Sequence, residues 1–397
     1  MTLCMCWAAC CTAGAREDEE HALSTRLTEW PVLYKADEGL VRRVKLNVRG
    51  QYQEAAVSPN GANRFRPGSG GHNAEWRRAY LGGEIRFAEG WRIWNLTNVG
   101  GLEGKRAASQ GAWVHRHTDW SLYELYVEKK WSKGRINLGK LTPHYTPEYC
   151  LSSSSIKTVE RSAMVNQVIT VSNWGLWSAY EPAQGEEYAA GIYLSDTNRD
   201  LSREVAWSDD GRVFTLLGVK RRLAARGGFK QTLSGQYVHN FARFRGCAVP
   251  ADSDYAGPGM QDIVSLGWEA SCANWLFMGN LIGGCGLEGR AKGKQAYGLI
   301  GMASNRFAPH WEAVLRYQCS LGRDAVKTDT RYITSVTEYP AWVDRLQAVY
   351  LGLNYYVFPA IPDMMKLMLG IEYTTTSAHG AHGFDGWTVM GAARFRF

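Results

Sequence analysis

Basic side chains recur at every second position in several segments of this sequence. Between Arg43 and Gln53, charged or amide side chains alternate with Val44, Leu46 and Val48. A period of two is typical of a β-strand, whose successive side chains point to opposite faces. The basic groups of one segment would therefore share a face. Arginine and lysine gathered on a confined surface attract anions, arginine as a bidentate partner and lysine as a point charge.

Other combinations of residues that could do chemistry are weaker. Asp196, Asn198 and Asp200 resemble the start of a calcium loop, but its sixth position would be Leu201 instead of glycine and its twelfth Trp207 instead of glutamate. We interpret this stretch as a surface loop. The glycine-rich stretches LGGEIRFAEG and LIGGCGLEG are followed by no helix that could bind a phosphate.

Two groups that contain histidine, and the cysteines, have side chains that can bind a metal. The histidine groups are His115, His117 and Asp119, and His379, His382 and Asp385. A strand or loop without metal is the better interpretation of both. The cysteines beyond the first 15 residues lack C-x-x-C spacing and are odd in number: Cys150, Cys247, Cys272, Cys285 and Cys319. They predict neither a zinc site nor a disulfide framework. We predict no enzyme, no metal and no cofactor.

The segment GWTVMGAARFRF, from Gly386 to Phe397, shows what the alternating segments could form. One face is apolar, with Trp387 near one end and Phe395 and Phe397 at the other. A soluble β-sandwich would bury this face. Aromatic residues at both ends of the face instead favour a strand that crosses a bilayer, which takes roughly 9–11 residues.

Similar segments occur along most of the chain. We predict strands at Arg43–Gln53, Trp76–Phe87, Trp91–Val99, Trp120–Trp131, Arg135–Lys140, Asn173–Glu181, Glu187–Ser195, Arg212–Arg221, Phe229–His239, Gln261–Glu269, Asn274–Gly283, Ala296–Ser304, His310–Gln318, Asp344–Tyr356, Met364–Tyr373 and Gly386–Phe397. Short and long connections alternate between them. This pattern predicts an all-β protein, a transmembrane antiparallel up-and-down β-barrel of about sixteen strands with both termini on the periplasmic side.

Composition agrees with a barrel. The 397 residues carry a net charge of +7, and mean hydropathy is −0.31. No run of 18 apolar residues exists, which excludes helical membrane spans. Trp (16) and Tyr (20) together far outnumber Phe (12), and these amphipathic rings suit membrane interfaces.

The chain divides into three predicted parts. Residues 1–15 are apolar and small-rich and precede an acidic stretch, which predicts a signal peptide, with a lipoprotein site at Cys10 as the alternative. Residues 16–40 would be a periplasmic N-terminal segment, and residues 41–397 the barrel.

Residues 134–162, GRINLGKLTPHYTPEYCLSSSSIKTVERS, lead from a strand into a serine-rich loop. This stretch resembles the family of phosphate-selective porins O and P. The segments TDWSLYELYVEKKWSKG and AEWRRAYLGGEIRFAEGWRIW resemble strands of the same family. The resemblance spans most of residues 40–397. It implies a sixteen-stranded trimeric porin whose third extracellular loop folds into the lumen, although this loop contains few basic residues for a phosphate site.

Assigning the polar face of each strand to the lumen predicts the pore lining. The predicted pore-lining and anion-binding residues are Arg43, Lys45, Arg49, Arg78, Arg86, Lys130, Arg135, Lys157, Arg161, Arg316, Lys366, Arg394 and Arg396. Five acids join them on the strands, Glu84, Glu124, Glu128, Glu312 and Glu372. The basic excess favours anions. The alternative is that these are ordinary solvated side chains paired with the glutamates.

The leading functional hypothesis is a porin of a Gram-negative outer membrane for passive diffusion of small solutes, with a preference for anions such as phosphate. Its partners would be outer-membrane lipid, small anions and further copies in a homotrimer, with no nucleic acid. One alternative is an outer-membrane barrel with a mainly structural or adhesive role. The other is a soluble all-β carbohydrate-binding protein.

Overall fold

The computed structural model describes residues 26–397, apart from 28, 62–63, 100–104, 107–112, 115–120, 195–212, 226, 242–257, 287–292, 329–330 and 380–382. Most described residues lie in one sheet of 17 strands. Sixteen of them form the barrel: β2 (Val41–Pro59), β3 (His72–Phe87), β4 (Trp91–Asn98), β7 (Ser121–Trp131), β8 (Gly134–Leu141), β9 (Asn173–Tyr180), β10 (Glu186–Leu194), β11 (Val213–Arg222), β12 (Lys230–Asn240), β13 (Met260–Cys272), β14 (Trp275–Gly286), β15 (Gln295–Ala308), β16 (Trp311–Lys327), β17 (Trp342–Tyr356), β18 (Met365–Ser377) and β19 (Asp385–Arg396).

The remaining elements are short. The seventeenth strand is β1 (Val32–Lys35), and a separate two-stranded sheet holds β5 (Lys105–Arg106) and β6 (Trp113–Val114). The helices are the 3-10 turn η1 (Ala88–Gly90), α2 (Pro147–Cys150), α3 (Ala163–Val168) and α4 (Ile333–Val336). Among the described residues, no helix is both long and apolar enough to cross a membrane.

The barrel is closed. Each barrel strand pairs antiparallel with its neighbours in the chain, and the last strand, β19, pairs with β2 from Gly386 opposite Pro59 to Arg396 opposite Arg49. Closure satisfies the backbone hydrogen-bonding groups of every barrel strand, as a bilayer requires. The prediction of an all-β up-and-down barrel with about sixteen strands is confirmed.

Side chains alternate between an apolar exterior and a covered interior. On β16, Leu315 and Tyr317 point outward with 48% and 40% of their surface exposed, whereas Val314 and Arg316, which alternate with them, are buried. The outward leucines of β14, β17 and β18, such as Leu281, Leu351 and Leu369, are likewise exposed. A contiguous apolar belt around a closed barrel is the lipid-facing surface of a transmembrane barrel.

Several strands are longer than predicted at the end of the barrel away from Phe397. The alternation predicted strands of Arg43–Gln53 and His310–Gln318, but β2 continues to Pro59 and β16 to Lys327. Beyond the membrane an apolar face is no longer required. The sequence pattern therefore fades before the backbone pairing does.

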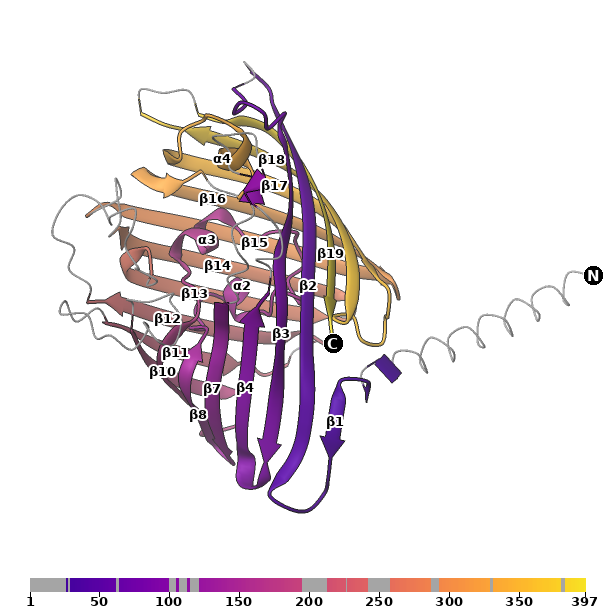
Figure 1. Ribbon diagram of the computed structural model, residues 1–397. Helices are drawn as coiled ribbons and strands as arrows, with labels where there is room; N and C mark the ends of the chain where they lie inside the picture. Colours follow the sequence, from indigo (N-terminus) through magenta and orange to yellow (C-terminus); the bar gives the residue numbers. More distant parts are fainter. Residues whose placement is uncertain are drawn as a thin grey trace, which may run out of the picture.

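Both ends of the described chain lie at the same end of the barrel. Strand β1 pairs with Arg43–Lys45 of β2, next to Phe397, which exchanges backbone hydrogen bonds with Val48. The rings of Trp30 and Phe397 pack edge to face with centroids 6.2 Å apart. Short turns such as η1 are at this end (Figure 1). The division at residues 15 and 40 stays a prediction.

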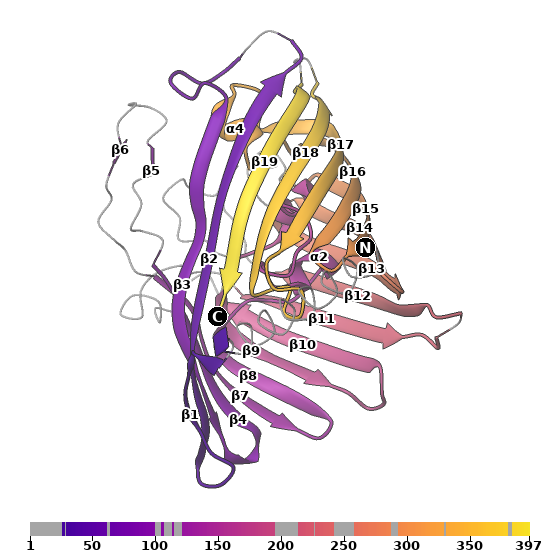
Figure 2. The ribbon, with the colours of Figure 1, turned by 90° about the vertical axis from the view of Figure 1, so that its right-hand side faces the viewer.

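The connection between β8 and β9 runs through the barrel interior (Figures 1 and 2). We call residues 142–172, which contain α2 and α3, the inner segment. Its apolar side chains, such as Tyr145, Met164 and Val168, form a buried cluster with inward side chains of β9 to β17. A second cluster joins Val159 of the inner segment and α4 to the inward faces of β14 to β19 and β2. One side of the interior is therefore filled by apolar packing.

Candidate functional site

The opposite side of the interior is basic. We call the following set the basic wall: Arg43, Lys45 and Arg49 of β2, Arg78 and Arg86 of β3, Arg92 of β4, Lys130 of β7, Arg135 of β8 and Arg396 of β19. All of them keep part of their surface exposed, and Arg86, Lys130 and Arg396 are the most exposed. These residues lie side by side because their strands are neighbours in the sheet, in the order β19, β2, β3, β4, β7 and β8.

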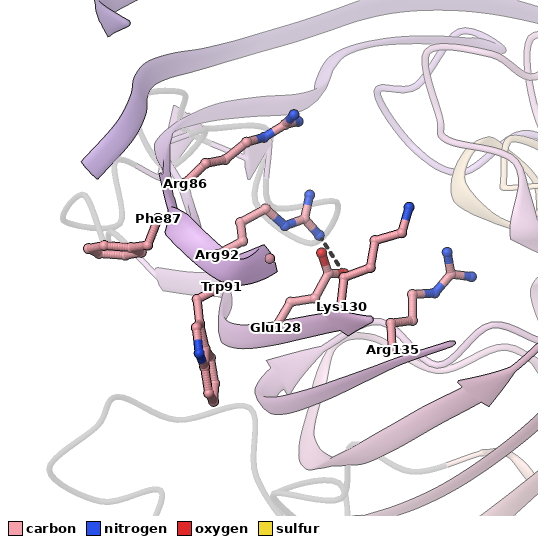
Figure 3. Close-up of a pocket in the computed structure, with 8 residues that line it drawn as sticks. Arg86, Phe87, Trp91, Arg92, Glu128, Lys130 and Arg135 are labelled. Atoms are coloured by element: carbon pink, nitrogen blue, oxygen red, sulfur yellow. Dashed lines mark hydrogen bonds and ion pairs between the residues drawn. The ribbon is translucent and has the colours of Figure 1, made fainter. Parts of the chain in front are cut away.

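Strand register brings several of these cations side by side. Arg43 lies opposite Arg86, Arg86 opposite Arg92, and Lys130 opposite Arg135. Figure 3 shows the side chains of Arg86, Arg92, Lys130 and Arg135 on one side of the sheet and the rings of Phe87 and Trp91 on the other. The cations line a pocket of about 370 Å³ near the η1 turn.

Acidic side chains neutralise part of this charge. Glu84 forms ion pairs with Arg86 at 2.7 Å and Arg92 at 3.3 Å, and Glu128 pairs with Arg92 at 3.0 Å. Arg135 pairs with Glu187 of β10 at 3.1 Å. In the described part of the chain, Arg43, Lys45, Lys130 and Arg396 make no ion pair with an acid. The wall therefore keeps a positive excess.

Some hydrogen-bond donors of the wall are also unused. Within the described residues, the Nε atoms of Arg43, Arg49 and Arg92 are buried and have no hydrogen-bond partner. A buried donor without a partner is costly, and an anion or water that accepts from it removes that cost. These three nitrogen atoms are covered by other atoms of the barrel, so the wall presents to the lumen its charge and the exposed parts of its side chains.

The other predicted pore-lining residues hold the inner segment. Arg316 is 2% exposed and pairs with Glu372 of β18 at 2.8 Å and with Glu148 of α2 at 3.2 Å. It also donates to the carbonyl oxygen of Glu160 at 2.7 Å. The sequence indicated a water-facing arginine, but a buried guanidinium needs partners, and the inner segment supplies them.

Lys366 and Arg394 do the same from β18 and β19. Lys366 donates to the carbonyl oxygen of Ile156 at 2.7 Å, and Arg394 donates to the carbonyl oxygens of Ser153, at 3.0 Å, and Val159. Both side chains are almost fully buried, with 1% and 2% exposed. The two side chains hold the inner segment in place, and the segment covers them.

Lys157 and Arg161 belong to the inner segment itself. Lys157 forms an ion pair with Glu312 of β16 at 2.9 Å. Arg161 is buried, donates to the carbonyl oxygens of Glu148 and Leu151, and lies 5.1 Å from the Tyr149 ring. Both hold the fold of the segment more than they extend the basic wall.

A third attachment joins the inner segment to β2, β3 and the residues before α4. Glu160 pairs with Arg77 of β3 at 3.0 Å and accepts from Gln53 at 2.7 Å. Arg331, which precedes α4, lies 3.9 Å from Glu160 and also pairs with Glu75. Burial opposes the charge of Glu160, but the guanidinium groups of Arg77 and Arg331 outweigh it and hold the pKa of Glu160 well below its ordinary value.

The sequence pattern did not predict three of these arginines as site residues. Arg92 stands in the predicted strand Trp91–Val99, and the same alternation that selected Arg86 would have selected it. Arg77 and Arg331 carried no such signal, because a strand irregularity and a connecting segment place them. The residues 115–119, 196–200 and 382, considered as metal sites, lie outside the described residues.

No family model matches this sequence, and no curated protein matches it. Solved structures do. An anion-selective porin from Comamonas acidovorans has a TM-score of 0.56 at 12% identity, covering 89% of this chain and 99% of that one. OprB of Pseudomonas putida has a TM-score of 0.55 at 10% identity, and the match covers 89% of this chain and 94% of OprB. The trimer form of OmpT, an outer membrane protein of Vibrio cholerae, has a TM-score of 0.51 at 9% identity, and the match covers 89% of this chain and 99% of OmpT.

At these identities the likeness establishes a fold. The chain has the fold of outer-membrane porins, and its apolar belt fits the same environment. Its architecture is that of a Gram-negative outer-membrane β-barrel.

Proposed function

We propose that the protein is a porin through which small solutes diffuse passively, with a preference for anions that includes phosphate. The observation that carries the proposal is the basic wall. Its positive excess lies on the side of the lumen that the apolar clusters leave free. A confined surface of one charge raises the local concentration of the opposite ion. The resemblance to phosphate-selective porins O and P supports phosphate among the solutes.

The inner segment supports a narrow passage. Its contacts with β16, β18 and β19 attach it to one side of the interior. On the side of the wall it touches β2, where Ser153 accepts from Gln51 at 2.8 Å and from Arg49 at 3.5 Å. Solutes would therefore pass between the segment and the basic wall. We further propose a homotrimer, as in the trimer form of OmpT.

A planar bilayer recording tests the proposal. The purified protein should give discrete conductance steps, and in a KCl gradient its reversal potential should show that chloride is more permeant than potassium. Phosphate should carry current when it replaces chloride. A folded protein without conductance would favour the structural or adhesive alternative, and a cation preference would contradict the role of the wall. Cross-linking in detergent tests the trimer.

A further inference from the structure

Aromatic rings line the same side of the interior as the basic wall. Tyr80 of β3 and Trp94 of β4 are buried there together with Leu96, and Tyr123 and Tyr126 of β7 pack against them. The Tyr80 and Tyr123 rings are stacked, with centroids 4.6 Å apart and planes inclined by 23°. Tyr123 and Tyr126 keep part of their surface exposed. Attraction of simple anions needs charge and not rings, so this cluster calls for another explanation.

Guanidinium groups lie beside these rings. Arg49 is 6.0 Å from the centre of the Tyr80 ring, and Arg92 is 5.6 Å from the rings of both Trp94 and Tyr126. Arg49 and Arg78 of the same wall keep part of their surface exposed. Donors for an acid group and faces for a ring thus occur together on one surface.

The inner segment has a similar pair, in which Arg161 lies over the Tyr149 ring at 5.1 Å. Both residues are almost fully buried, and Arg161 donates to carbonyl oxygens of the segment itself. The donors and ring faces that reach the open side of the interior therefore come from the wall.

From this arrangement we propose that the passage retains small anions whose acid group is attached to a ring. The acid group accepts hydrogen bonds from Arg49 and Arg78, and the ring lies against the exposed part of Tyr123. This inference rests on the proposed anion-preferring pore and names the class of solute that the pore handles best. The shared chemistry is an acid group on a flat ring face, whether the ring is aromatic or a sugar.

The test is a block of chloride current by four probes in a planar bilayer. Benzoate is compared with acetate, and glucose 6-phosphate with inorganic phosphate. Each ring-bearing probe should halve the current at a concentration roughly twofold to tenfold lower than its ringless counterpart, which is the scale of one ring contact. The two pairs distinguish an aromatic from a sugar ring. Equal block within both pairs would overturn the inference.

Variants separate the ring contact from the charge. Tyr123→Leu should remove the advantage of the ring-bearing probes while leaving the reversal potential in KCl unchanged, and Tyr123→Phe should keep it. Tyr373→Leu, a matched control on the outer surface of β18, should behave as the natural protein. If Tyr123→Leu does not fold, Tyr126→Leu makes the same comparison. The proposal is contradicted if ring-bearing probes still block at lower concentrations than their ringless counterparts in the variant that folds. A channel of the natural protein that shows no anion preference would instead contradict the proposed function.

Discussion

Arg316 of β16 and Glu372 of β18 form an ion pair of 2.8 Å inside the barrel, with only 3% and 2% of their side chains exposed. The strand between them contributes Tyr350, whose ring lies 5.4 Å from the guanidinium group. Because Glu148 of the inner segment also binds Arg316, one buried cation connects the barrel to the segment that fills it. Charges of the lumen therefore fall into two groups, those that hold the inner segment and those that meet solute.

Replacing Arg316 should destabilise the barrel. Arg316→Met leaves Glu148 and Glu372 buried without their cation, which costs about 3–5 kcal/mol when one partner of a buried pair is removed. Arg316→Glu should be worse, because it places a third carboxylate in the same site. Heat-modifiable migration on gels and unfolding in urea measure the effect. Arg396→Met at the exposed rim is the control, and equal resistance of all three variants would contradict the buried role.

Reversing charge on the basic wall should change ion preference without this penalty. The triple variant Arg43→Glu, Lys130→Glu, Arg396→Glu should fold, because these side chains keep contact with water and make no ion pair with an acid among the described residues. Its reversal potential in a KCl gradient should move toward that of a cation-preferring pore. The shift should shrink between 0.1 M and 1 M salt, as the Debye length falls from about 10 Å to about 3 Å.

The control for ion preference is Lys230→Glu, an exposed position at the start of β12. It should leave the reversal potential where it is. A triple variant that folds and keeps the natural reversal potential would show that the wall does not set selectivity.

Acid should not release the inner segment at moderate pH. The pKa of Glu160 is lower in the folded protein than in the unfolded chain, so its charge contributes stability above the ordinary value near 4.3. That contribution is lost only as pH falls through the lower folded pKa. Single-channel conductance should therefore be steady from pH 7 to pH 5. Glu160→Gln should give larger current fluctuations at pH 7, and a natural channel that already fluctuates at pH 5 would argue against this attachment.

A glycine of β13 allows the inner segment to fit. A Cβ atom at Gly267 would lie 2.2 Å from Cγ of Pro147, the first residue of α2. Gly267→Val should displace α2, cost about 1–3 kcal/mol as overpacking does, and change the single-channel conductance. Gly301→Val is the matched control, since nothing lies within 4 Å of a Cβ atom there. Equal conductance in the two variants would mean that α2 does not border the passage.

The strands could be predicted because a lipid-facing belt imposes alternation on the sequence. Leu351 and Leu369 repeat that pattern whatever the interior contains. The same alternation placed Arg49 and Arg316 on inward faces. The alternation could not show that Arg49 stays partly exposed while Arg316 is buried. Burial of Arg316 depends on partners far along the chain, such as Glu148, which lies 168 positions before it. An inward position is a local property, whereas contact with solute depends on how residues 142–172 cross the interior.

The one-sided distribution of charge has a consequence for how a molecule would travel. With cations gathered on β2 to β8 and apolar packing on the far side, the electric field in the passage has a component across the barrel axis. A neutral molecule with an uneven charge distribution is turned by such a field, so that its negative end leads toward the arginines. Neutral isomers whose dipoles point in different directions would then permeate at different rates. Such discrimination requires no net charge on the solute.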